Sequence, residues 1–171
     1  DAKRRETCAY LTGIMRLASR LGARALVFGS PVNRDRGEMS PEQARSVAVP
    51  FFRELGSRSR DLDVVLCIEA NPPQYKCDFF TNSEEAQDLV SAVGSDGFGL
   101  HLDTAAMHLA GEDVPAQVRK LAARACHFHV SAPNLGPVGP EAPIDYPGVA
   151  AALRGATYAN WVPIEMRPPS D

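Results

Sequence analysis

The sequence has 171 residues, of which 44% are hydrophobic, and a formal net charge of −3. This length and apolar content suit one compact domain over residues 1–171, so a second domain is not expected. The acidic balance gives no general attraction to phosphate backbones, which makes nucleic acid an unlikely partner on charge alone. No apolar run approaches the roughly 20 residues of a membrane-spanning helix, so no membrane partner is expected.

The cysteines form no C-x-x-C pair, and a chain of this size does not need disulfides to hold its fold. The simple interpretation is four reduced thiols in a cytoplasmic protein. They are Cys8, Cys67, Cys77 and Cys126.

The first predicted elements are a helix, a buried strand and a second helix. Apolar residues recur at helical spacing from Glu6 to Leu21, and Gly22 stands where a helix often stops. The unbroken apolar run Ala25–Phe28 predicts a strand that is covered on both faces. Ser40-Pro41-Glu42-Gln43 has the pattern of a capping box with a proline in the first turn, so a helix should run from there to about Leu55.

The same alternation continues to the end of the chain. A strand over Val64–Ile68 ends at Glu69, and a capping box from Thr81 to Glu84 opens a helix to about Val93. Connections of this length exclude hairpins and favour a parallel sheet of right-handed βαβ units, which is the α/β class. The later elements are a strand from Phe98 to Asp103, a helix from about Asp113 to Arg124, a strand Cys126–Val130, a helix from about Pro147 to Leu153 and a strand from Trp161 to Glu165.

An open doubly wound sheet and a (β/α)₈ TIM barrel both fit this alternation. Four strands in a row end in side chains of the metal-binding type, which favours the top face of a barrel. A full barrel needs about 250 residues and eight strands, whereas only five strands are expected here. We therefore predict the C-terminal part of a (β/α)₈ TIM barrel, about five βα units. Further N-terminal residues or another chain should complete it, because open sheet edges must be paired or covered.

The candidate metal ligands are Glu69, Asp103, His129 and Glu165, at intervals of 34, 26 and 36 residues. These intervals are close to the 30 or so residues of one βαβ unit, so the four side chains should lie at one height. Each alone is more often a hydrogen-bonded or solvated group. Together, three carboxylates and an imidazole would repel and desolvate one another without a cation. One divalent ion, Mn²⁺, Co²⁺, Mg²⁺ or Zn²⁺, resolves this.

Other polar side chains stand near these ligands in the sequence. His101 and His127 each precede a ligand by two residues and so share its face of the strand, where a packed histidine is slightly favoured over a functional one. Three further candidates each have a simple alternative role. Arg34 could be a solvated loop side chain, His108 could be exposed to solvent, and Asn134 could form a turn. The candidate substrate-binding residues are Asn33, Arg34, His108 and Asn134.

Several short stretches resemble one known family, the xylose-isomerase-like barrel superfamily of sugar phosphate isomerases and epimerases. The resemblance covers nearly the whole chain and corresponds to the last five of the family's eight strands. The stretches are Phe28–Arg34, Ile68–Pro73, Leu100–Thr104 and His127–His129, with Ile164-Glu165 closing.

The resemblance implies that Glu69, Asp103, His129 and Glu165 are metal ligands and that the two glutamates also move the substrate proton. A metal on the carbonyl and hydroxyl oxygens acidifies the α C–H and stabilises an enediolate, while one carboxylate removes the proton and the other returns it. The expected activity is isomerisation or epimerisation of a small polyhydroxy carbonyl compound, a sugar or sugar phosphate.

Three positions depart from the family pattern and leave the substrate open. Ala106 stands where many of these epimerases have a histidine, and Ala132 and Leu135 stand where they often have a glutamate and an arginine. Two alternatives are kept. The first is an endonuclease IV-like metal-dependent phosphoesterase, which would need more histidines and a basic surface. The second is a non-catalytic partial-barrel subunit.

Overall fold

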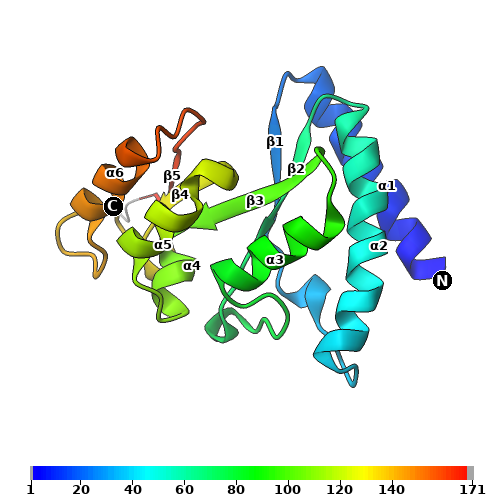
Figure 1. Ribbon diagram of the computed structural model, residues 1–171, viewed down its shortest axis with the longest axis horizontal. Coiled ribbons are helices and arrows are strands. Elements are labelled where there is room, and N and C mark those ends of the chain that lie inside the picture. The colour runs from blue at the N-terminus through cyan, green and yellow to red at the C-terminus, as the bar shows by residue number, and fades with distance from the viewer. Residues whose placement is uncertain (1, 169–171) are drawn as a thin grey trace.

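The structure is a computed structural model that describes residues 2–168. Five parallel strands pair in sequence order and form a half-barrel with the helices outside it (Figure 1). This confirms the predicted α/β fold with about five βα units. The strands are β1 (Ala25–Phe28), β2 (Val65–Glu69), β3 (Phe98–Asp103), β4 (Ala125–Ser131) and β5 (Ile164–Glu165).

The helices follow the strands in the order that a barrel requires. In Figure 1, α1 and α2 lie side by side at one end of the sheet, and α6 lies at the other end. No helix among residues 2–168 is long and apolar enough to span a membrane. The helices are α1 (Ala2–Arg20), α2 (Pro41–Arg60), α3 (Ser83–Val93), α4 (Thr104–Leu109), α5 (Val114–Leu121) and α6 (Tyr146–Gly155), with 3₁₀ turns η1 (Val32–Arg34), η2 (Pro73–Tyr75), η3 (Ala122–Arg124) and η4 (Pro133–Leu135).

The two faces of the sheet have different roles. Ile68, Leu102 and Phe128 are fully buried in the hydrophobic core that the strands share with the helices. Side chains alternate between the faces of a strand, so the neighbours Glu69 and Asp103 point to the opposite face. That inner face of the half-barrel carries the polar residues and the candidate site.

Local sequence signals set the starts of α2 and α3. The predicted capping box of α2 is confirmed, because Ser40 and Gln43 bond each other's backbone N–H groups. The cap predicted for α3 was wrong by one residue. Asn82 is the N-cap, and its Oδ1 accepts from the Glu85 N–H at 2.9 Å, while the Thr81 N–H donates to the Glu85 carboxylate at 2.8 Å. Asparagine is at least as good an N-cap as threonine, so the helix begins after Asn82 and not after Thr81.

Two elements differ from the sequence expectation. Helix α4 begins directly after β3 and was not predicted; the Asp103 side chain caps it by accepting from the Ala106 N–H at 2.7 Å. The last strand is only Ile164–Glu165, whereas it was expected to begin at Trp161, which is 81% exposed. Pro163 has no N–H to donate to a neighbouring strand, which limits the pairing to this short segment.

Candidate metal centre

The fold brings the four predicted ligands together at the C-terminal ends of the strands. Glu69, Asp103 and Glu165 are the last residues of β2, β3 and β5, and His129 lies opposite Asp103 in the β3–β4 register. Asp103, His129 and Glu165 each offer a ligand atom, and these atoms lie within 4.8 Å of one another. Glu69 and Asp103 share a second such group with His101. The His129 Nδ1 is 3.1 Å from the Glu165 Oε2.

The Glu69 carboxylate sits in a confined position beside Gly29. A Cβ at position 29 would lie 1.9 Å from the Glu69 Oε2, so only glycine leaves room for the carboxylate. Burial and the neighbouring charges of Asp103 and Glu165 raise the pKa of Glu69 to about 8. Without a cation, this position therefore disfavours an ionised Glu69.

Asp103 is held by two donors. The Ser131 hydroxyl donates to Oδ2 at 2.6 Å, and the Ala106 N–H donates to Oδ1 at 2.7 Å. Burial raises the pKa of Asp103, and the hydrogen bonds from Ser131 and Ala106 oppose that rise. These bonds fix the orientation of the carboxylate, as hydrogen bonds around a metal ligand commonly do.

The donor set fits a divalent cation. Two groups of side chains meet at Asp103: one contains His129 and Glu165, and the other contains Glu69 and His101. Burial and the negative charges of Asp103 and Glu165 raise the pKa of Glu69. A cation bound among them removes both the repulsion and the cost of burying negative charge. Oxygen ligands with a single imidazole suit a hard or borderline ion such as Mn²⁺, Mg²⁺, Co²⁺ or Zn²⁺.

Three of the four candidate ligands, Glu69, Asp103 and Glu165, line a cleft of about 320 Å³. Each of the four ligands is followed, two residues later, by a residue of the cleft lining: Asn71, Ala105, Ser131 and Arg167. For Asn71, Ser131 and Arg167, alternation along an extended chain places residues i and i+2 on the same side. Ala105 instead lies in the first turn of α4. Sequence reasoning missed these four residues, although the period of two could have identified the first three.

The predicted substrate-binding residues occupy different environments. Asn134 lines the cleft, and its N–H donates to the Tyr75 hydroxyl at 3.2 Å. Arg34 is buried, and its Nη1 donates to the Glu69 carbonyl oxygen at 2.7 Å, so it supports the backbone behind the ligand. Asn33 is exposed in η1 and His108 is half-buried in α4; neither is part of the cleft lining.

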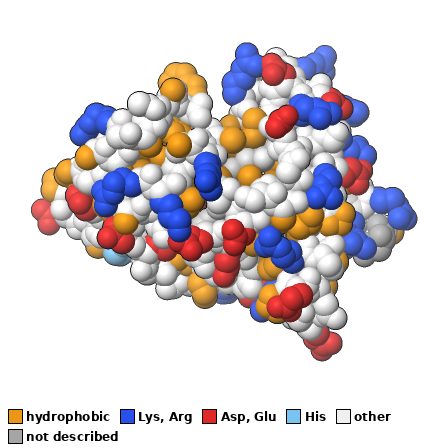
Figure 2. All heavy atoms as spheres, in the orientation of Figure 1, with side chains coloured by type: hydrophobic (Ala, Val, Ile, Leu, Met, Phe, Trp, Pro, Cys, Tyr) orange, Lys and Arg blue, Asp and Glu red, His pale blue; other side chains and the backbone are white. Residues whose placement is uncertain are grey.

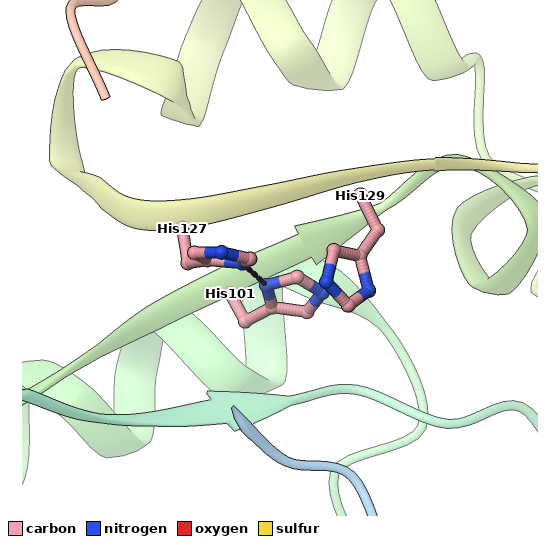
Figure 3. Close-up of side chains that lie close together, drawn as sticks. All are labelled: His101, His127 and His129. Atoms are coloured by element: carbon pink, nitrogen blue, oxygen red, sulfur yellow. Dashed lines mark hydrogen bonds between the residues drawn. The ribbon is translucent and has the colours of Figure 1, made fainter. Parts of the chain in front are cut away.

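Three histidine rings lie together, and one of them belongs to the candidate ligand His129 (Figure 3). His101 comes from β3, whereas His127 and His129 come from β4. The Nδ1 atoms of His101 and His127 are 3.2 Å apart. Burial and the two neighbouring histidines lower the pKa of His101 to about 2, so its ring is neutral.

Comparison with solved structures shows the same fold in larger proteins. D-Psicose 3-epimerase from Clostridium cellulolyticum H10, crystallised with D-tagatose, matches with a TM-score of 0.85 and 19% identity, over 95% of this chain and 57% of that one. An AP endonuclease, family 2, from Brucella melitensis matches with a TM-score of 0.83 and 16% identity, over 99% and 64%. The IOLI protein with a bound zinc atom matches with a TM-score of 0.79 and 19% identity, over 97% and 62%.

The chain therefore spans 57% to 64% of the length of these structures, and at such identities the likeness shows the fold alone. No curated protein matches the chain in sequence. The family description "Xylose isomerase-like TIM barrel" matches residues 1–171, so the chain belongs to the xylose isomerase-like TIM barrel family.

Proposed function

We propose that this protein is a divalent-metal-dependent isomerase or epimerase of a small sugar or sugar phosphate. The observation that carries the proposal is the position of Glu69 and Glu165. They stand at the ends of β2 and β5, with Asp103 and His129 on the two strands between them. One carboxylate therefore stands on each side of the proposed metal-binding pair. One of them can remove a proton from the substrate carbon, and the other can return it.

The bound ion would polarise the substrate's carbonyl and hydroxyl oxygens and so acidify the neighbouring C–H. Glu69 removes or returns the proton at that carbon through a carboxylate oxygen. Glu165 does the same from the other side, and its side chain is 48% exposed, which allows proton exchange with solvent.

The cleft is suited to a small polar substrate. Its volume of about 320 Å³ is near the lower end of the range of about 300–1,000 Å³ for small-molecule sites. Tyr75, Asn71 and Asn134 offer hydrogen-bonding groups, and Arg167 offers a cation for a hydroxyl or phosphate group. Leu135 lines the same cleft where many epimerases of this family have an arginine, so we expect a different substrate from theirs.

The comparisons support an epimerase more than a nuclease. Several of the similar structures are sugar epimerases by their descriptions, including an L-ribulose 3-epimerase and a 3-keto-D-glucoside 4-epimerase. A nuclease needs a basic surface for the phosphate backbone. The chain has a net charge of −3, and acidic and basic side chains are interspersed on the face shown in Figure 2.

We also propose that further βα units, from the same polypeptide or from another chain, complete the barrel. β1 pairs only with β2, and β5 pairs only with β4, so the described sheet has two open edges. Near the β5 edge, Trp161 is 81% exposed and Ile164 is 62% exposed. Open edges with apolar side chains favour association.

The test of the proposed reaction is solvent exchange. The metal-loaded protein is incubated with a panel of ketoses and ketose phosphates in D₂O, and deuterium is measured by mass spectrometry and NMR. We expect deuterium at the carbon next to the carbonyl, no exchange with Glu69→Gln or Glu165→Gln, and normal exchange with Glu6→Gln, which changes an exposed glutamate of α1. Product without solvent deuterium would indicate a hydride shift. Cleavage of abasic DNA with no ketose exchange would favour the nuclease.

A further inference from the structure

We propose that His101, His127 and His129 form a second site, for a zinc-class divalent ion, which competes with the carboxylate site for His129. The competition between the two sites rests on the proposed function, because it requires a metal ion at the carboxylate site. The existence of the histidine site does not depend on the proposed function. The three histidines are shown together in Figure 3.

The geometry of the three rings is that of a cation site. Each ring offers one nitrogen, and the three nitrogens lie within 4.8 Å of one another. The Nδ1 atoms of His101 and His127 are 3.2 Å apart. Two nitrogens bound to one tetrahedral zinc ion at about 2.0–2.1 Å lie about 3.3 Å apart. The spacing of this hydrogen-bonded pair therefore suits a shared ion, which would replace the proton between the two nitrogens once the rings turn toward it.

One nitrogen of the cluster, the His101 Nε2, lacks a protein partner among the described residues. His101 is 1% exposed, so this nitrogen is buried. The Glu69 Oε1 is 3.9 Å from this nitrogen, which is too far for a hydrogen bond. A buried nitrogen without a partner is costly, and a bound ion that reorients the ring would remove that cost.

His129 connects the two sites. Its Nδ1 faces the Glu165 carboxylate at 3.1 Å, and its ring lies edge-on to His101 with a centroid distance of 4.4 Å. The carboxylate site is rich in oxygen and suits Mn²⁺ or Mg²⁺, whereas a site of three imidazoles suits zinc. A zinc-class ion on the histidines would therefore withdraw His129 from the carboxylate site and weaken binding of the harder ion there.

The test uses zinc alone, followed by manganese. X-ray absorption at the zinc edge counts imidazole ligands, and titration against a zinc indicator gives the affinity. We expect about three imidazoles per zinc in the wild-type protein. His127→Ala should lower zinc affinity by at least about tenfold, because a direct ligand matters no less than the outer partners whose loss costs about 10- to 100-fold. His127→Gln, which keeps a hydrogen-bonding side chain, should have the same effect if His127→Ala does not fold.

Two controls separate this site from the carboxylate site. His108→Ala removes the histidine outside the cluster and should leave zinc binding unchanged. Glu165→Gln should weaken manganese binding, measured by the free-ion signal in electron paramagnetic resonance, and preserve the three-imidazole zinc spectrum. His127→Ala should preserve manganese binding and require more zinc to displace it. A single imidazole per zinc in the wild-type protein, or unchanged zinc affinity in both His127 variants, would overturn the proposal.

Discussion

The Glu69 carboxylate occupies the space beside the Gly29 backbone where any other residue would place its Cβ atom. A Cβ at position 29 would lie 1.9 Å from the Glu69 Oε2. Gly29→Ala should therefore displace the carboxylate and weaken manganese binding, measured by calorimetric titration. Gly13→Ala is the matched control, because a Cβ at position 13 meets nothing within 4 Å. That control should bind manganese normally and gain up to about 1 kcal/mol of stability from helix propensity. Equal manganese binding by the two variants would mean that the position of Glu69 does not control the site.

Ser131 is expected to be important for the site although it is not a ligand. Its hydroxyl donates to Asp103 and accepts from the buried Ala105 N–H at 3.0 Å. Ser131→Ala leaves that N–H unpaired, which should cost about 1–3 kcal/mol of unfolding free energy. Loss of the bond to Asp103 should lower metal affinity by about 10- to 100-fold. Ser46→Ala, at an exposed position of α2, should change neither quantity in chemical denaturation or titration.

Arg34 is expected to stabilise the fold. The buried guanidinium donates to the Glu69 carbonyl oxygen at 2.7 Å and to the Ser30 carbonyl oxygen at 3.4 Å. Arg34→Met removes both bonds, and we expect a loss of about 2–3 kcal/mol in the free energy of unfolding. Arg16→Met, at an exposed position of α1, should be nearly neutral in the same urea titration. A change in substrate KM with unchanged stability would instead favour the substrate-binding role predicted from the sequence.

The pKa of Glu69 predicts how the stability of the metal-free protein depends on pH. The folded pKa of about 8 lies above the ordinary glutamate value of 4.5, so the folded state binds the proton more tightly. This contribution to stability is complete below about pH 4.5 and is lost as the pH rises through 8. The pKa of His101 is lowered to about 2, so His101 makes stability rise with pH, which is the opposite effect. It does so only below pH 6.5, the pKa of His101 in the unfolded chain.

Between pH 6.5 and 8 the effect of Glu69 is therefore not offset by His101. We expect the free energy of unfolding to fall by up to about 1.4 kcal/mol per pH unit there. Urea titrations at several pH values measure the slope, and Glu69→Gln should reduce it. The same slope in the variant and the wild-type protein would show that another group is responsible.

Much of the fold was predictable because apolar runs and capping residues report local structure directly. The run before Glu69 and the cap at Ser40 are examples. Helix α4 was missed because its cap is Asp103, whose carboxylate was assigned only to the metal. The last strand was overestimated because an apolar composition around Trp161 does not reveal whether a pairing partner exists.

The positions of the candidate ligands were predictable, and their surroundings were less so. Glu69 and Asp103 each follow an apolar run in the sequence, which placed them correctly at the ends of β2 and β3. The space at Gly29 and the bond from Ser131 depend on how neighbouring strands are staggered, which sequence spacing alone does not give. The same holds for Arg34, whose burial depends on the conformation of the η1 turn.

The most direct test of the central claim is the manganese content of the purified protein. After dialysis against Mn²⁺ and removal of free ions, elemental analysis of the wild-type protein should give about one tightly bound ion per chain, since structural binding requires the complete ligand set. Glu69→Gln and His129→Ala should each lose it, while both variants keep the circular dichroism spectrum of the wild-type protein. Manganese content that is unchanged in both variants would contradict the assignment of Glu69, Asp103, His129 and Glu165 as one metal site.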